Sequence, residues 1–156
     1  MITIRPARED DYDEIARVWF EGYLASSYGE TPPPEITQDF LRARIPGDIA
    51  ERGWALYAAE EDGRIVAMLA TIPRERALDQ IFLGDGVRGR GVGHELLNFV
   101  KKQMPDGFWL RTHITNAKAQ GFYAHEGMRH THDAPHPRHP EAMFRWYAWP
   151  KTFAPP

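Results

Sequence analysis

Near the middle of the chain the sequence reads Leu83-Gly84-Asp85-Gly86-Val87-Arg88-Gly89-Arg90-Gly91-Val92-Gly93. It follows a short apolar, strand-like run at residues 78–83 and precedes apolar residues at helical spacing between positions 96 and 104. Glycines let the backbone approach an anion closely, and the first N–H groups of a helix have no intrahelical acceptor. Arg88 and Arg90 add charge-assisted donors. The sequence therefore predicts a phosphate-binding turn at residues 88–93.

The segments on either side alternate between strand-like and helix-like patterns. Besides 78–83, the predicted strands are 2–5, 54–60, 65–71, 108–112, 128–131 and 143–149. The predicted helices are 10–23, a second ending at Pro46-Gly47, a third ending at Pro105, and 117–126. Asp62-Gly63 indicates a tight hairpin turn, and residues 132–140 read as a Pro/His-rich loop. This order predicts one mixed α/β domain over residues 1–156, with a right-handed parallel crossover around the glycine-rich turn.

Composition excludes several classes of protein. A net charge of -3 argues against duplex nucleic acid as the main partner. The chain has no cysteine, which excludes disulfides, thiolate zinc sites and acyl transfer through an enzyme-bound cysteine. No apolar run has the length of a membrane span, and the N-terminal residues leave no room for a signal peptide. A soluble cytoplasmic protein without a membrane partner is expected.

A second phosphate motif overlaps the first. Gly84 to Gly89 matches the dinucleotide fingerprint G-x-G-x-x-G. That fingerprint normally opens its domain on the first strand and is followed by several βαβ units. Here most predicted strands come before it, so a dinucleotide site is the weaker interpretation.

Residues 88–93 resemble the Arg/Gln-x-x-Gly-x-Gly/Ala signature of the GNAT superfamily of N-acetyltransferases. A second segment resembles the same family: Asn116, Ala119, Phe122-Tyr123 and Gly127 stand at its characteristic positions. Together with the strand order, the resemblance covers nearly the whole chain. It implies the acyl-CoA N-acyltransferase fold, a mixed, mostly antiparallel sheet of about seven strands with helices on both faces.

The resemblance also implies roles for particular residues. Acetyl-CoA would be held by Leu83, Arg88, Gly89, Arg90, Gly91, Val92, Gly93, Asn116 and Tyr123, with no metal. The Leu83 amide would stabilise the oxyanion, and Tyr123 would protonate the CoA sulfur. Tyr123 has a packing role as its alternative, and Asn116 a helix cap. Gly84-Asp85-Gly86-Val87 departs from the family's Pro-Glu-like segment, which makes the assignment of Leu83 less direct.

The sequence leaves three features open. The base that deprotonates the amine could be Asp79, His113 or a water relay. The histidines between His130 and His139 could bind a metal, although a Pro-rich loop is the favoured interpretation. Segment 143–149 could contribute a contact between two copies in a homodimer.

The predicted reaction is direct transfer of an acetyl group from acetyl-CoA to a primary amine in a ternary complex. The acceptor would be a small molecule or a peptide. Its lining would come from Trp19, Tyr23, Tyr28 and the prolines at 32–34. The alternative function is a non-catalytic acyl-CoA-binding module.

Overall fold

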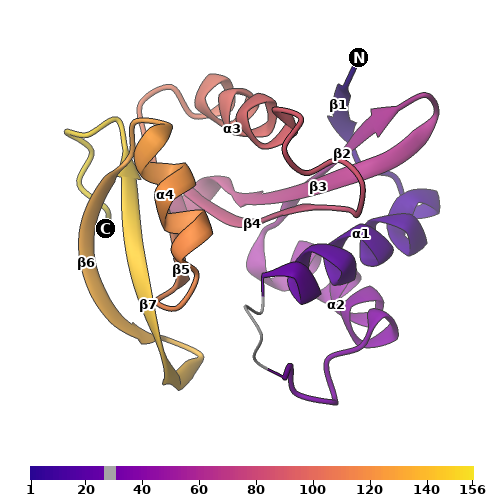
Figure 1. Ribbon diagram of the computed structural model, residues 1–156, viewed down its shortest axis with the longest axis horizontal. Helices are drawn as coiled ribbons and strands as arrows, with labels where there is room; N and C mark the ends of the chain where they lie inside the picture. Colours follow the sequence, from indigo (N-terminus) through magenta and orange to yellow (C-terminus); the bar gives the residue numbers. More distant parts are fainter. Residues whose placement is uncertain (27–30) are drawn as a thin grey trace.

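The computed structural model describes residues 1–26 and 31–156 (Figure 1). The strands are β1 (Thr3–Pro6), β2 (Ala55–Glu61), β3 (Arg64–Ile72), β4 (Ala77–Leu83), β5 (Phe108–His113), β6 (Arg129–His136) and β7 (His139–Trp149). The helices are α1 (Tyr12–Ala25), α2 (Gln38–Arg52), α3 (Val92–Gln103) and α4 (Ala117–His125). Short 3₁₀ turns precede α1 (Glu9–Asp11) and β4 (Pro73–Glu75). The order of elements is the predicted one.

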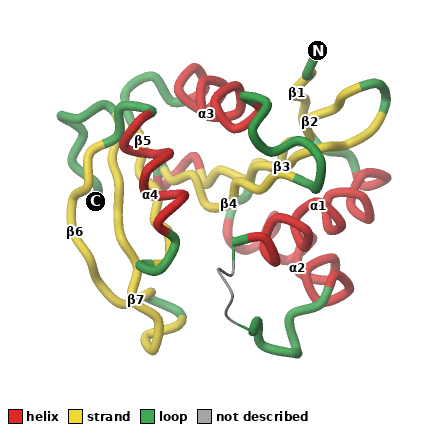
Figure 2. The backbone as a smooth tube through the Cα atoms, viewed as in Figure 1, coloured by secondary structure: helices red, strands yellow, loops and turns green. Residues whose placement is uncertain are grey.

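The strands form one seven-stranded sheet in the order β1-β2-β3-β4-β5-β7-β6. Neighbouring strands are antiparallel except for β4 and β5, which are parallel. The predicted mixed, mostly antiparallel sheet is confirmed. Figure 1 and Figure 2 show that β5, β7 and β6 run in a different direction from β3 and β4. The sheet therefore consists of two parts that meet where β4 lies next to β5.

Helices cover both faces of the sheet, and each face has its own core. Alternate residues of β3 supply both cores, because successive side chains of a strand point to opposite faces. Met68 and Ala70 pack with α1 and α2, whereas Ala67 and Leu69 pack with α3. Leu96, on α3, is fully buried, and burial of such a side chain contributes roughly 1.5–3 kcal/mol. Within the described chain, no helix is long and apolar enough to span a membrane.

The hairpin between β2 and β3 confirms the turn prediction. Asp62 and Gly63 both have positive φ, 54° and 76°. Positive φ at both central residues matches the twist of the flanking strands.

The predicted end of the second helix at Pro46-Gly47 is wrong. Helix α2 continues to Arg52, and Gly53 ends it in the left-handed conformation. A proline inside a helix costs about 3 kcal/mol relative to alanine. Contacts beyond Pro46 offset that cost, because buried Asp48 pairs with Arg44 and Arg52 one turn away on either side.

The predicted loop at residues 132–140 is also wrong. Strand β6 extends to His136 and pairs with β7, with Pro135 opposite Met143. Strand β6 lies at the edge of the sheet, where proline is tolerated because one side of the strand needs no donor. The register shifts twice along this pair, at residues 130/132 and 135/136.

Candidate active site

Strands β4 and β5 part soon after they meet. Their register contains one pair, Ala77 opposite Trp109, and the Trp109 N–H donates to the Arg76 carbonyl at 2.9 Å. On the other side of β4 the register with β3 shifts so that Asp79 is an extra residue, a β-bulge. Bulges bend a strand and increase its twist. Beyond the Ala77–Trp109 pair the later parts of β4 and β5 have no register with each other, and we call this unpaired stretch between the two strands the opening.

The N–H of Leu83 faces this opening. The next residue, Gly84, donates its N–H to the carbonyl of Val66 on β3 at 2.8 Å. Successive N–H groups of a strand point to opposite edges, so the Leu83 N–H points to the edge nearer β5. This is the orientation that the oxyanion role requires.

The glycine-rich turn leads directly from β4 into α3. Gly91 is the N-cap residue of α3, with φ of +80° and no side-chain cap. A residue with a Cβ would be strained at that φ, and a capping side chain would compete for the first helical N–H groups. The next residue, Val92, is buried in the core, whereas Gly93 lies against the ring of Phe122 on α4. The start of α3 therefore presents backbone N–H groups beside α4.

The two arginines of the turn contact the protein itself. Arg88 donates to the carbonyl of Leu83 at 2.9 Å, to the carbonyl of Glu21 at 3.2 Å and to Asp85 at 2.9 Å. Arg90 pairs with Glu61 at 2.7 Å. In this arrangement both side chains hold the turn in place, and the donors left without a partner side chain at the start of α3 are backbone amides.

Helix α1 contacts the turn directly and supports it, a feature that sequence reasoning missed. Glu21 accepts a hydrogen bond from the Asp85 N–H at 2.9 Å. At Gly22, an added Cβ would lie 2.7 Å from the Cβ of Phe82 and 3.0 Å from the Leu83 carbonyl oxygen. Only glycine allows α1 to approach β4 this closely. An isolated glycine in the last turn of an amphipathic helix was the available signal.

Tyr123 lies in the core between α3, α4 and the later strands. It is 7 % exposed, and its ring centroid lies 5.7 Å from that of Tyr147 and 5.5 Å from that of Phe122. Burial raises the pKa of the Tyr123 phenol, and Tyr147 raises it further. The hydroxyl therefore stays protonated at neutral pH and can donate a hydrogen bond.

Asn116 caps helix α4. Its Oδ1 accepts from the Ala119 N–H at 3.0 Å. The helix-cap interpretation is confirmed, and the segment that carries Tyr123 begins at this cap.

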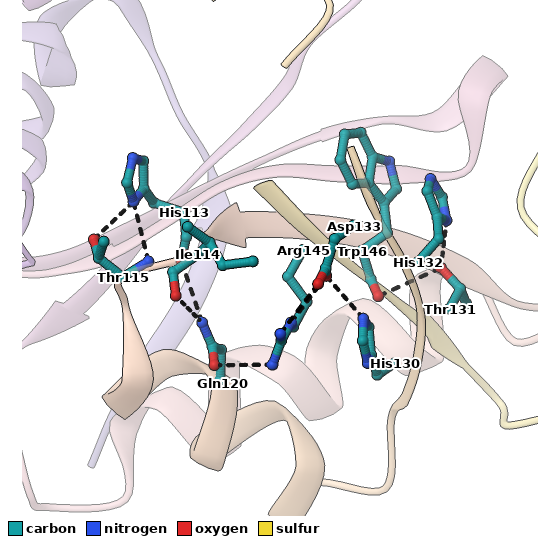
Figure 3. Close-up of polar contacts among 10 residues, drawn as sticks. All are labelled: His113, Ile114, Thr115, Gln120, His130, Thr131, His132, Asp133, Arg145 and Trp146. Carbon is teal, nitrogen blue, oxygen red and sulfur yellow. Dashed lines mark hydrogen bonds and ion pairs between the residues drawn. The ribbon is translucent and has the colours of Figure 1, made fainter. Parts of the chain in front are cut away.

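The two candidate bases are both engaged. Asp79 accepts from Arg52 at 2.8 Å through Oδ1, and from the Trp54 indole N–H at 2.9 Å and the Gln80 amide at 3.5 Å through Oδ2. His113 accepts from the Thr115 N–H through Nδ1 at 3.1 Å (Figure 3). Since a backbone N–H can only donate, the neutral His113 ring carries its proton on Nε2. Neither side chain offers a free acceptor atom in this arrangement.

A polar network joins α4 to the last two strands (Figure 3). Gln120 donates to the Ile114 carbonyl at 2.8 Å and accepts from Arg145 at 3.3 Å. Arg145 also pairs with Asp133 at 2.9 Å, and Asp133 contacts His130 at 2.8 Å. The network fixes the start of α4 against β7 and β6. Among the described residues, no group of three His, Cys, Asp or Glu side chains could hold a metal ion.

The predicted acceptor lining is only partly brought together. Trp19 is 2 % exposed and packs on Trp54, with ring centroids 5.4 Å apart, so it belongs to the core. Tyr23 is half-buried, and burial together with Glu35 raises the pKa of its phenol. Tyr28 lies outside the described residues.

Three solved structures illustrate the likeness of this fold. The apo form of YjaB from Escherichia coli is 21 % identical, with a TM-score of 0.76 and coverage of 96 % of this chain and 97 % of that one. The PaiA N-acetyltransferase of Thermoplasma acidophilum, in complex with coenzyme A, is 14 % identical, with a TM-score of 0.69 and coverage of 94 % and 98 %. Spermidine N-acetyltransferase from Vibrio cholerae, in complex with CoA and spermine, is 16 % identical, with a TM-score of 0.68 and coverage of 94 % of both.

These identities show the fold alone. No curated protein matches the sequence. Residues 12–128, well over half of the chain, match the acetyltransferase (GNAT) family. That segment contains the parting strands, the glycine-rich turn and the tyrosine of α4. The chain belongs to the GNAT acetyltransferase family.

Proposed function

We propose that residues 1–156 act as one catalytic domain that transfers the acetyl group of acetyl-CoA to a primary amine. The observation that carries the proposal is the opening between β4 and β5, with the Leu83 N–H facing it and the uncapped start of α3 beside it. A chain that only bound nucleotide would need the second feature but not the first. Acetyl transfer from acetyl-CoA requires both an anion site for the pyrophosphate and a donor for the oxyanion that forms at the thioester.

The chain's own groups then have distinct tasks. The first N–H groups of α3 bind the pyrophosphate, and the helix dipole adds to their attraction. The Leu83 N–H donates a hydrogen bond to the carbonyl oxygen, where negative charge develops as the amine nitrogen bonds to the carbonyl carbon. The electron pair returns from that oxygen as the carbon–sulfur bond breaks, and the acetylated amine and the CoA thiolate leave, the thiolate then taking a proton from water.

Tyr123 serves the departing sulfur in this proposal. Its raised pKa makes the phenol a poor proton source but a dependable hydrogen-bond donor, because it stays neutral. A thiolate is a modest base, so a donated hydrogen bond lowers the barrier before any proton moves. The proton lost by the amine passes to a water relay, since both Asp79 oxygens and the His113 Nδ1 already accept from the chain.

Transfer is direct, without an acyl-enzyme. No cysteine is available to carry the group, and the Tyr123 oxygen is buried and protonated. Product inhibition by CoA and by the acetylated amine would follow ternary-complex rather than ping-pong kinetics.

The decisive test is a screen of amines with acetyl-CoA, measuring release of free thiol and formation of acetylated product. Thiol release that depends on an amine supports the proposal. Calorimetric titration with CoA is run in parallel. Saturable CoA binding with no acetylated product from any amine would favour the acyl-CoA-binding module instead.

A further inference from the structure

One face of the later strands carries two arginines that the proposed transfer does not use. Phe108 and Leu110 of β5 point into the core beneath α3, so Trp109 and Arg111 point to the opposite face. Arg138 lies in the turn between β6 and β7, and its N–H donates to His136, whose ring packs against Phe144 on the same face of β7 as Trp146. We call Arg111 and Arg138, together with the indoles of Trp109 and Trp146, the arginine face.

Arg111 is held between two aromatic rings. Its guanidinium carbon lies 5.2 Å from the ring centroid of Trp109 and 5.5 Å from that of Trp146, which is its partner across the strand pair. Stacking covers the flat faces of a guanidinium and leaves its in-plane N–H donors at the edge. That edge matches a carboxylate, which can accept two parallel hydrogen bonds.

The arginine face has an excess of positive charge. On α2 and β4 nearby, Arg44 and Arg52 are paired with Asp48 and Asp79. In the described part of the chain, neither Arg111 nor Arg138 forms an ion pair. Arg44 and Arg52 are thus balanced by Asp48 and Asp79, whereas the charges of Arg111 and Arg138 are not balanced by an ion pair in the described part of the chain. Glu75 attracts Arg111 but only at longer range.

The pKa shifts of three groups agree with an excess of positive charge on the arginine face. Burial lowers the pKa of Arg111, and Arg138 and Arg52 lower it further. Burial, Arg52 and Arg44 lower the pKa of Arg138. Burial lowers the pKa of His136 to about 4, with contributions from Arg111 and Arg138.

The arginine face borders the opening between β4 and β5. Arg111 stands two residues beyond Trp109 on β5, and Asp79 stands two residues beyond Ala77 on β4. Because the strands part from the Ala77–Trp109 pair, these two residues flank the start of the opening. Asp79 also raises the pKa of Arg111. An acceptor that enters from this face meets the arginines on its way to the Leu83 N–H.

We propose that the acceptor is a small amine that also carries a carboxylate, bound by Arg111 and Arg138 while its amine reaches the opening. This inference rests on the proposed acetyl transfer and names its substrate class. The same excess of positive charge disfavours polycationic acceptors such as polyamines. Carboxylate amines are of two kinds, with the amine next to the carboxylate or remote from it, and the panel below separates them.

The test compares each acceptor with its own carboxamide. The panel holds L-amino acids, ω-amino acids, the carboxamide of each, and spermidine. We expect kcat/KM for the best carboxylate to exceed that of its carboxamide by at least about tenfold. A carboxamide makes a neighbouring amine less basic, so more of that amine is neutral and reactive near pH 7. For L-amino acids, intrinsic reactivity therefore favours the carboxamide, and a preference for the carboxylate has to come from the protein. Equal values for the two forms, or a preference for spermidine, would overturn the inference while leaving acetyl transfer intact.

Two variants locate the effect. Arg111→Gln and Arg138→Gln should each raise KM for the carboxylate and reduce its preference to about threefold or less, with KM for acetyl-CoA unchanged. Arg138 is exposed in a turn, so its variant tests the site even if Arg111→Gln destabilises the fold. Arg64→Gln, an exposed arginine at the start of β3, is the matched control and should keep the full preference. Full preference in the Arg138 and Arg111 variants would contradict the assignment.

A binding measurement keeps the inference testable if no amine turns over. Saturation-transfer NMR with CoA present would compare N-acetyl-L-leucine and N-acetyl-4-aminobutyrate with their carboxamides. Binding of a carboxylate form alone, lost in Arg138→Gln, would support the carboxylate site even though acetyl transfer had failed. Binding that ignores the carboxylate, or no binding to any probe, would reject it.

Discussion

The two sides of the opening between β4 and β5 are built from different parts of the chain. On the side of α3, the groups proposed to bind a ligand are backbone amides, and the nearby arginines Arg88 and Arg90 are bound to the protein itself. On the opposite side, the groups are side chains, led by Arg111 between its two tryptophans. Backbone amides suit a ligand part common to the whole family. Side chains suit the part that differs from one family member to another.

The largest expected effect tests the backbone side. Gly91→Glu should weaken CoA binding by at least about 100-fold, because a carboxylate at the N-cap repels the pyrophosphate and the +80° φ strains the new residue by about 1–2 kcal/mol. Isothermal titration with CoA measures it. Gly63→Glu is the matched control, since Gly63 has φ of +76° and open space around it, like Gly91. Normal CoA affinity in the Gly91 variant would mean that the anion binds elsewhere.

The second expected effect separates chemistry from binding on the same side. Tyr123→Phe should lower kcat by about 10- to 100-fold, because the leaving sulfur loses its hydrogen-bond donor. The Kd of CoA should change by less than about threefold. Tyr147→Phe removes a hydroxyl from the neighbouring ring and serves as the control. Turnover that survives intact in Tyr123→Phe would leave that residue with a packing role only.

The third effect contrasts an ion pair from each side. The Asp79 side chain is 7 % exposed and paired with Arg52, whereas the Asp85 side chain is 72 % exposed and paired with Arg88. Asp79→Asn should lower the free energy of unfolding by about 2 kcal/mol, because it removes the closer and more buried counter-charge of Arg52 and leaves only the 3.5 Å pair with Asp48. Asp85→Asn should cost less than about 1 kcal/mol. Urea unfolding gives both values, and equal losses would show that burial does not distinguish the two sides.

The smallest effect concerns acid on the arginine-bearing side. The pKa of His136 falls from its ordinary 6.5 to about 4, chiefly through burial. Between these values the unfolded chain binds a proton that the folded protein does not, so stability is lost as pH falls from 6.5 to 4. One such group contributes at most about 1.4 kcal/mol per pH unit. His136→Gln should flatten this pH dependence in urea titrations, more than His125→Gln, an exposed residue of α4. An unchanged slope would contradict the buried neutral state of His136.

The same contrast explains what the sequence could reveal. The turn at residues 84–93, the Asp62-Gly63 hairpin and the amphipathic third helix are local patterns, and each was predicted. The continuation of α2 through Pro46 is accompanied by ion pairs within the helix, and the extension of β6 to His136 depends on pairing with β7; both predictions failed. Local propensity cannot register an ion pair one turn further on or a neighbouring edge strand.

The candidate site divides in the same way. Asn116 was placed correctly because a cap is a local motif. Other contacts join residues from separate elements. Glu21 and Gly22 of α1 contact the turn and the end of β4. Arg111 stacks on Trp109 and on Trp146. No spacing in the sequence shows such contacts. Tyr123 and Leu83 were found through the family resemblance, and their roles stay predictions.

The separation of β4 from β5 has a consequence for hydrogen–deuterium exchange of the backbone amides. Ile81 and Leu83 direct their N–H groups toward the opening, although β4 is the middle strand of the seven. Central-strand amides are ordinarily among the slowest to exchange with deuterium, because only global unfolding exposes them. These two should exchange rapidly in the free protein and slow down when a thioester fills the gap. Deuterium exchange at these two amides would thus show whether the opening is occupied, without turnover and without knowledge of the acceptor.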